Sequence, residues 1–321
     1  MSDFTRTVIV DADGNGDYKY INQAALSLVS TGGTIIVEQG TYTIDGTYSE
    51  TPPLIDQRTV SVPSNVTIIG RGNAVIEVTA SVPAFVNYGQ TLGTPESNDR
   101  ITISGFKIEL KNTSEIYGVN LIDFQDVSNC VLEDLTISTE SGRGVWPGDY
   151  DESLERKYTV SAIYLTGNSN TIEKCTILNF GRIYNDGEDD YNNYGYGIHL
   201  TDSSSDNVIK NNFFSSCSNN VYLYESDYNI IKNNIIECGK TRTKRIVDGG
   251  EIAYTPQVSS NCLLERCDGT IYIGNISMDS DGYIRWYDGT YLNSEYINME
   301  SMQRPCDQGR YEVEYGNDYC F

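Results

Sequence analysis

One short phrase recurs in the middle of this chain and limits the folds that the chain can adopt. It reads NTIEKCTI from Asn170, NVIKNNFF from Asn207 and NIIKNNII from Asn229, and an apolar-x-Leu triplet precedes each copy. Ile209 and Ile231 hold the same place in the last two copies and lie 22 residues apart. A repeat of this length predicts one turn of a parallel β-helix, in which each coil buries its apolar edge only by stacking on another coil.

The repeat extends in both directions from these copies. From Ile103 onward the gaps between equivalent residues are 29, 40, 37, 22 and 33, so most coils carry insertions. The best-defined insertions are 141–158, 181–194 and 239–250, and each leaves the coil just before the strand that carries the apolar-x-Leu triplet. Insertions confined to one face usually build a binding face. The residues expected to stack in one internal column are Ile68, Ile103, Leu132, Ile172, Ile209, Ile231 and Leu264.

The predicted fold class is all-β, a single-stranded right-handed parallel β-helix. Residues 1–50 are expected to form a strand–helix cap, with one amphipathic helix over 20–29. Residues 51–269 form the solenoid, where Asn211-Asn212 and Asn233-Asn234 are placed to stack as a ladder of side-chain amides at a corner. Residues 270–321 are expected to form a C-terminal β module of antiparallel hairpins, because apolar alternation is interrupted there by Asp-Gly turns.

The charge of the chain excludes some partners. Its 45 acidic residues outnumber 22 basic ones, which gives a net charge of −23 and argues against nucleic acid or an anionic membrane as the partner. No apolar run has the length of a membrane span or the character of a signal peptide. Such acidity fits either a solubilising shell or a high-salt habitat. Either a leader has been removed, or the protein leaves the cell without one, as virion components do on lysis.

The N-terminal segment also carries a resemblance to a known family. The stretch VIVDADGNGDYKYINQAAL, followed by GGTIIVEQGTY, resembles the opening of pectate-lyase-like and pectin-methylesterase-like β-helix proteins, including phage tailspikes. The coils over about 65–270 resemble the same superfamily. The resemblance implies the fold and, from the tailspikes, a homotrimer. It does not imply an enzyme, because the Trp-Ile-Asp-His, Arg-x-Pro-x-x-Arg and Gly-His-Gly motifs of the family's enzymes are missing.

The strand that carries the apolar-x-Leu triplet should point its middle residue outward, because side chains alternate along a strand. The expected outward ladder is Asn120, Tyr164, His199 and Tyr222, followed two residues later by Thr166, Thr201 and Tyr224. His199 is the only histidine and has the intrinsic pKa of a general base. The alternative is that it replaces a tyrosine in a stacked ladder.

The insertions interleave carboxylates with aromatic residues, as saccharide sites do. Aromatic rings cover the apolar faces of sugars, and carboxylates bond hydroxyls, chelate Ca²⁺ or act as paired acid and base. No cofactor is otherwise implied, and a solvated acidic loop is the simpler alternative. The catalytic candidates are Asp149, Asp151, Asp186, Glu188, Asp189 and Asp190, with His199 as an auxiliary. The substrate-binding candidates are Trp146, Tyr150, Asn120, Tyr164, Tyr184, Tyr191, Tyr194, Tyr222 and Tyr224.

The sequence therefore favours a virion-surface protein of the tailspike, fibre or head-decoration type. Its expected partners are a host surface polysaccharide or glycoprotein, other virion proteins, and two further copies of itself through 286–296. One alternative is a carbohydrate-active enzyme, such as a polysaccharide lyase, a glycoside hydrolase or an epimerase. The other is a purely structural β-helix spacer.

Overall fold

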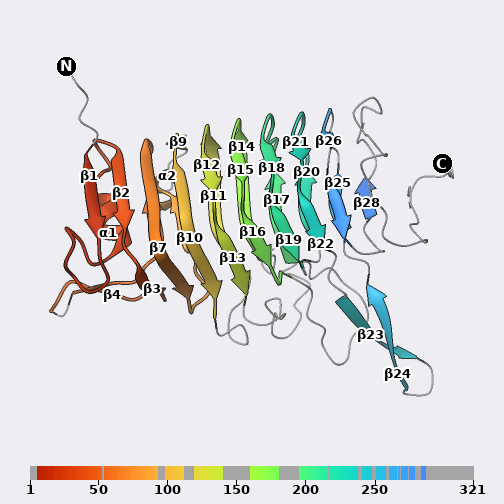
Figure 1. The fold of residues 1–321 in the computed structure, drawn as a ribbon, viewed down its shortest axis with the longest axis horizontal. Coiled ribbons are helices and arrows are strands. Elements are labelled where there is room, and N and C mark those ends of the chain that lie inside the picture. The colour runs from red at the N-terminus through yellow and green to blue at the C-terminus, as the bar shows by residue number, and fades with distance from the viewer. Residues whose placement is uncertain are drawn as a thin grey trace.

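The computed structural model is a stack of coils whose strands lie side by side along the long axis of the molecule (Figure 1). Almost all of these strands are parallel, in one sheet of 15 strands and one of 9 strands, which we call sheet 1 and sheet 2. The structure describes residues 6–52, 54–92, 98–111, 119–139, 160–180, 195–215, 217, 219–237, 241–247, 251–257, 260–265, 267, 269–273, 275–278 and 283–286.

Sheet 1 supplies two of the three faces of the coil, and β7 and β10 run through both. Row one contains β1 (Thr7–Val10), β2 (Gly33–Val37), β7 (Val66–Val78), β10 (Thr102–Leu110), β12 (Val131–Glu133), β15 (Thr171–Glu173), β18 (Val208–Lys210), β21 (Ile230–Lys232) and β26 (Ile271–Ile273). Row two continues β7 and β10 with β3 (Gly40–Ile44), β13 (Thr136–Thr139), β16 (Thr176–Leu178), β19 (Phe213–Ser215), β22 (Ile235–Glu237) and β27 (Ile276–Met278).

Sheet 2 closes the third face of the coil. Its strands are β6 (Val60–Val62), β8 (Phe85–Asn87), β9 (Asn98–Asp99), β11 (Asn120–Ser128), β14 (Val160–Asn168), β17 (Gly195–Thr201), β20 (Asn219–Tyr224), β25 (Ser260–Glu265) and β28 (Tyr283–Trp286). Outside the two sheets lie the antiparallel pairs β4 (Tyr48–Ser49) with β5 (Ile55–Asp56) and β23 (Thr241–Val247) with β24 (Glu251–Gln257). The helices are α1 (Ile21–Leu26) and α2 (Tyr88–Leu92). No helix among the described residues is long and apolar enough to span a membrane.

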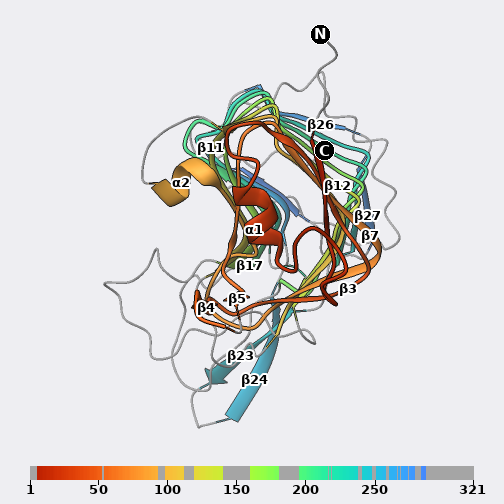
Figure 2. The same ribbon diagram turned by 90° about the vertical axis from the view of Figure 1, so that its left-hand side faces the viewer.

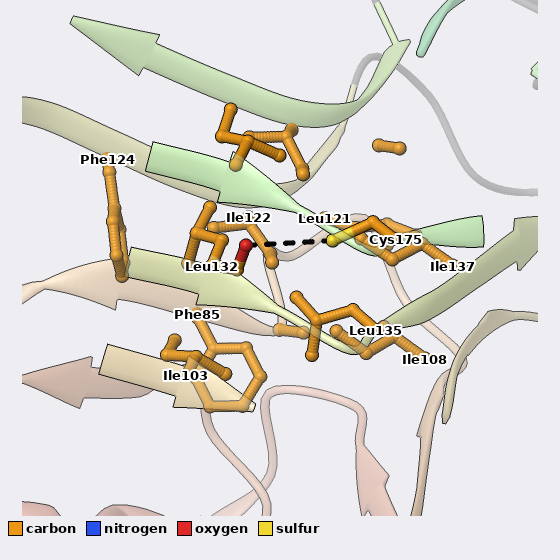
Figure 3. Close-up of a cluster of buried hydrophobic side chains, with 14 of the residues drawn as sticks. Phe85, Ile103, Ile108, Leu121, Ile122, Phe124, Leu132, Leu135, Ile137 and Cys175 are labelled. Atoms are coloured by element: carbon orange, nitrogen blue, oxygen red, sulfur yellow. Dashed lines mark hydrogen bonds between the residues drawn. The ribbon is translucent and has the colours of Figure 1, made fainter. Parts of the chain in front are cut away.

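The predicted internal column is confirmed except at its last member. Register pairs link Ile68, Ile103, Leu132, Ile172, Ile209 and Ile231 in that order. The next residue is Tyr272, whereas Leu264 pairs with Leu223 in sheet 2, so the placement of Leu264 was wrong. The cause is that the run LLERC around Leu264 resembles the row-one phrase IEKC, although it belongs to β25 of sheet 2 and the row-one strand of this coil is β26. Figure 3 shows Ile103 and Leu132 of this column packed with Phe85 and Phe124 of sheet 2.

The turns from row one to row two share one backbone conformation. Asp134, Lys174, Asn211 and Asn233 all have a positive φ, between 53° and 58°, at the turn from row one to row two. Each donates its backbone N–H to a carbonyl of the next coil, as Asn211 does to Lys232 at 3.1 Å. The left-handed conformation turns the chain sharply, and the hydrogen bond links that turn to the coil above.

The residue after each of these turns is buried, and in the last two of these coils it is Asn212 or Asn234 of the predicted ladder, whereas Asn211 and Asn233 make the turns and are not part of it. The Oδ1 of Asn212 accepts from the Cys175 N–H at 2.9 Å, and the Nδ2 of Asn212 donates to the Ile172 carbonyl at 3.1 Å. Asn234 and Asn275 repeat the pattern on the following coils. A second ladder, of Asn170, Asn207 and Asn229, lies at the corner between sheet 2 and row one and was not predicted.

The N-terminal helix is shorter than predicted and lies within the outline of the coil stack (Figure 2). Ala24, Ala25 and Leu28 are fully buried against the core. Asn22 accepts the backbone N–H of Ser61 at 3.0 Å, on the terminal strand of sheet 2. This bond satisfies a donor that a free sheet edge would leave unpaired.

The solenoid continues beyond its predicted end. β26, β27 and β28 pair in parallel with β21, β22 and β25, so the expected antiparallel hairpins are absent from the described parts of 271–286. The Asp-Gly turns at 281–282 and 288–289, and everything after Trp286, lie outside the described residues. The apolar alternation that suggested hairpins is equally the alternation of a parallel coil, since both bury one face of each strand.

The described flanks of the three insertions meet at one corner, between row two and sheet 2. The chain leaves β13, β16 and β22 and re-enters sheet 2 at β14, β17 and β25. The third insertion contains the hairpin of β23 and β24, which extends past the predicted limit of residue 250 and projects from the coil stack (Figure 1). The shared corner of departure that the sequence predicted is therefore confirmed for these flanks.

We predict that Asn212→Ala lowers the free energy of unfolding by about 2–6 kcal/mol, because it leaves the buried Cys175 N–H and Ile172 carbonyl without partners at about 1–3 kcal/mol each. The measurement is urea unfolding followed by circular dichroism. The control is Asn211→Gly, next in sequence, because Asn211 is exposed and glycine adopts its positive φ readily. Equal losses in the two variants would contradict a specific role for the ladder.

Candidate functional site

The outer face of sheet 2 carries a ladder of side chains in register. Asp123, Tyr164, His199 and Tyr222 are successive register partners on β11, β14, β17 and β20. The prediction that Tyr164, His199 and Tyr222 are neighbours on one face is confirmed. The place assigned to Asn120 in this row is wrong, because Asp123 occupies it.

The error at Asn120 has a structural cause. Leu121 and Ile122 are both fully buried, so two consecutive residues of β11 point into the core (Figure 3). Ala162 and Ile163 repeat this feature on β14. Simple alternation therefore fails, and the outer face gains a second row three residues before the first. The register partners in this second row are Asn120, Ser161, Tyr196 and Asn219.

The two rows meet in a cluster of four rings. His199 lies 4.7 Å from Tyr222 and 4.8 Å from Tyr196 between ring centroids. Tyr196 stacks on Tyr222 at 4.9 Å with an interplanar angle of 18°. Tyr164 meets His199 edge to face at 5.1 Å. The rings cover adjoining coils, so they form a continuous aromatic platform along the solenoid axis.

A network of side-chain amides adjoins the platform at Asp123. One carboxylate oxygen accepts from the Nε2 of Gln125 at 2.9 Å and from that of Gln90, on α2, at 3.3 Å. The other accepts from the Nδ2 of Asn120 at 3.2 Å. Three amides thus hold the Asp123 carboxylate in place, and none of them neutralises its charge.

The environment of the platform keeps the rings of His199 and Tyr164 neutral at pH 7. Burial lowers the pKa of His199 to about 3. Burial also raises the pKa of Tyr164, with further contributions from the carboxylates of Asp202, Asp123 and Asp126 and from a hydrogen bond to Asp202. A neutral imidazole of such low basicity is a weak general base, and a phenol with a raised pKa keeps its proton and can donate a hydrogen bond.

Most of the predicted site residues lie outside the described parts of the chain. These are the insertion residues Trp146, Asp149, Tyr150, Asp151, Tyr184, Asp186, Glu188, Asp189, Asp190, Tyr191 and Tyr194. Their flanks are described: Tyr196 of the ring cluster follows Tyr194 by two residues and lies on the second row. Of the remaining candidates, Thr166 pairs with Thr201, whereas Tyr224 pairs with Glu265.

Several site residues were missed by the sequence reading. Tyr196 was overlooked because strict alternation points it into the core, and Asp123 because the apolar-x-Leu triplet was placed three residues too early on β11. Gln90 comes from α2, between Ile68 and Ile103, where no helix was predicted. A signal for Asp123 exists: a pair of apolar residues, Leu121-Ile122, lies directly before it.

The described residues contain no cluster of three or more His, Cys, Asp or Glu side chains that could hold a metal ion. A cavity of about 150 Å³ lies at the other end of the solenoid, next to α1. Asp56 in its wall is bound by both the Arg58 guanidinium and Asn22, at 2.8–3.3 Å. This buried acid is fully used in closing the N-terminal coil, so we do not assign it to the candidate site.

Comparison with known proteins agrees with the fold. A family model described as the right-handed β-helix region matches residues 96–280. The sequence matches no curated protein.

Similar solved structures include a pectin methylesterase from carrot, at 11% identity over 94% of this chain and 88% of that one, with a TM-score of 0.39. An alginate lyase from Paenibacillus sp. str. FPU-7 matches at 13% identity over 90% and 96%, with a TM-score of 0.37. ORF18 of Geobacillus virus E2 matches at 12% identity over 88% and 58%, with a TM-score of 0.34. Such low values carry no argument about activity.

We predict that acid destabilises the wild type more than His199→Tyr, a variant that continues the tyrosine ladder. The folded-state pKa lies below the unfolded value of about 6.5, so only the unfolded chain takes up this proton as the pH falls from about 6.5 towards 3. The stability of the wild type relative to the variant should therefore fall over this window. Thermal unfolding at several pH values measures it, and a constant difference would contradict burial of the imidazole.

Proposed function

This chain belongs to the right-handed β-helix family, and we propose that the outer face of sheet 2 binds a glycan that lies along the solenoid. The observation that carries this proposal is the continuous platform of Tyr164, His199, Tyr196 and Tyr222 beside the Asp123 network. The clustered rings offer apolar carbon atoms, and the network next to them offers polar groups. Sugars present both an apolar face and a rim of hydroxyls, so the two halves of the site fit one ligand.

Binding without turnover is favoured over catalysis. A general base works best with a pKa near the working pH, and the pKa of His199 is lowered by burial to about 3. Its described ring contacts are to Tyr164, Tyr196 and Tyr222, which suits a stacking role. The enzyme alternative depends on the carboxylates of the insertions, and it is therefore an outcome that the experiments below must distinguish.

The finer proposal is a virion-surface adhesin that recognises a host polysaccharide or glycoprotein. The absence of the family's enzyme motifs supports it, as does the shared corner beside sheet 2 from which the insertions of several coils leave. A solenoid is suited to this task, because each added coil lengthens the binding face without changing its chemistry.

We predict that Tyr222→Ala weakens glycan binding about tenfold, equivalent to about 1.4 kcal/mol, because it removes a ring that contacts both Tyr196 and His199 at one end of the platform. The measurement is titration calorimetry on host polysaccharides selected by a binding panel. The matched control is Tyr228→Asn: Tyr228 is 57% exposed at a different corner, and asparagine tolerates its positive φ of 54°. Equal affinity in Tyr222→Ala and wild type would exclude the platform as the binding surface.

The same panel, assayed for released reducing ends, separates an adhesin from an enzyme. We expect binding with no turnover by the wild type. Turnover that falls about 10²–10⁴-fold in Asp186→Asn combined with Asp189→Asn, with binding retained, would instead establish the enzyme. Trp146→Ala serves as the comparison, because loss of a ring should affect binding before turnover.

The virion setting and the homotrimer are tested on the protein itself. We expect the purified chain to compete with virus for adsorption to host cells, and light scattering to give the mass of three chains. If the protein is an adhesin, an excess of the purified chain should prevent the virus from adsorbing to its host cells. A protein that binds glycans yet leaves adsorption unchanged would refute the virion role, and a monomer would refute the trimer.

A further inference from the structure

Buried polar atoms without partners gather on the outer face of sheet 2. They include the Oε1 of Gln90, the Oδ1 of Asn120, the Oγ of Ser161 and the Nδ1 of His199. Folded proteins pair the great majority of their buried polar atoms, and each exception calls for a physical explanation, such as a bound water, an ion or a ligand. Four such atoms lie close together on and beside this face, at Gln90, Asn120, Ser161 and His199.

These four atoms form a line along the solenoid. Gln90 and Asn120 both bond Asp123, Asn120 and Ser161 are register partners, and Ser161 lies one register step from Tyr196 beside His199. The line runs from α2 through β11 and β14 to β17. Adjacent strands lie about 4.8 Å apart, so the two steps from β11 to β17 span roughly 10 Å. A ligand that meets all four atoms must be extended in the same direction as the aromatic platform.

The unpaired atoms call for hydrogen-bond donors. Gln90 and Asn120 use their amide nitrogens on Asp123, so the groups left over are carbonyl oxygens, which only accept. The Ser161 hydroxyl can accept or donate, and so adapts to a ligand hydroxyl. The charged groups acting on Tyr164 are the carboxylates of Asp202, Asp123 and Asp126. An anionic ligand would meet both acceptor atoms and negative charge here.

We propose that this face takes a neutral, hydroxyl-rich glycan and discriminates against acidic polysaccharides. This inference rests on the proposed function and adds the chemical class of the ligand. Hydroxyl groups donate to the carbonyl oxygens of Gln90 and Asn120 and to the other unpaired atoms, while the sugar rings stack on the tyrosines. A carboxylated or sulfated chain offers fewer donors and adds repulsion from Asp123.

A metal ion is the other ligand that oxygen atoms attract, and the geometry disfavours it. Calcium requires six to eight oxygens that converge on one point. The amide groups of Gln90 and Asn120 turn their nitrogens, not their oxygens, towards the Asp123 carboxylate. The three side chains therefore do not point their oxygens at a common centre.

Ser161→Ala tests this inference, because its hydroxyl is fully buried and unpaired in the free protein. A structural role predicts lost stability, whereas a ligand-binding role predicts an affinity reduced about three- to tenfold with an unchanged or raised Tm. The matched control is Ser226→Ala, a second fully buried serine, whose Oγ donates to the Tyr224 carbonyl at 2.8 Å. We expect it to lower Tm and leave affinity unchanged. A drop in Tm without loss of affinity in Ser161→Ala would overturn the inference.

The ligand class is tested by titrating the full chain with neutral mannan, dextran and galactomannan, and with acidic alginate, polygalacturonate and hyaluronate. We expect binding within the neutral set, insensitive to NaCl and to EDTA. Binding to an acidic polymer alone, weakened by Tyr222→Ala, would overturn this inference and leave the proposed function standing. Binding that EDTA abolishes and Ca²⁺ restores would show a metal-mediated site and also overturn it. Binding to no polymer would reject the proposed function and this inference together.

Discussion

The stacking of one coil on the next is the interaction on which the rest of this structure depends. A coil of about 22 residues has no interior of its own, so its isoleucines become buried only when equivalent residues lie above and below. The same stacking must also satisfy the backbone at each corner, because a sharp turn takes amide groups out of the strand ladder. Asn170, Asn207 and Asn212 meet this second demand by bonding both a turn and the neighbouring coil.

The corner chemistry explains why the insertions gather where they do. Two of the three corners are fixed by left-handed residues and buried asparagines that follow each other from coil to coil. An insertion at either place would break the ladder on both sides. The third corner, between row two and sheet 2, connects β13 to β14, β16 to β17 and β22 to β25 and takes all three long insertions. Variation is thus directed to the edge of sheet 2, next to the platform.

The outer face of sheet 2 shows how a small departure from regular geometry creates a site. Two consecutive inward residues, such as Leu121 and Ile122, place the side chains on both sides of the pair on the outer surface. The face therefore carries two rows instead of one, and Tyr196 can stack on both His199 and Tyr222. Without the second row, the rings would form a single file, and Asn120 and Ser161 would lie in the core.

The sequence by itself determined the repeat, the fold class, most of the internal column and the corner from which the insertions leave. These follow from the period of the apolar residues, which is a local property and is repeated often enough to be read without coordinates. Only the tertiary structure decided the register at Leu264 and Asn120, the continuation of the coil past residue 270, and the second asparagine ladder. An apolar run indicates that a strand is buried, but it does not indicate which neighbouring strands pack against it. That choice depends on contacts between residues roughly one coil apart in space and up to 44 residues apart in sequence, as between Asn275 and Ile231.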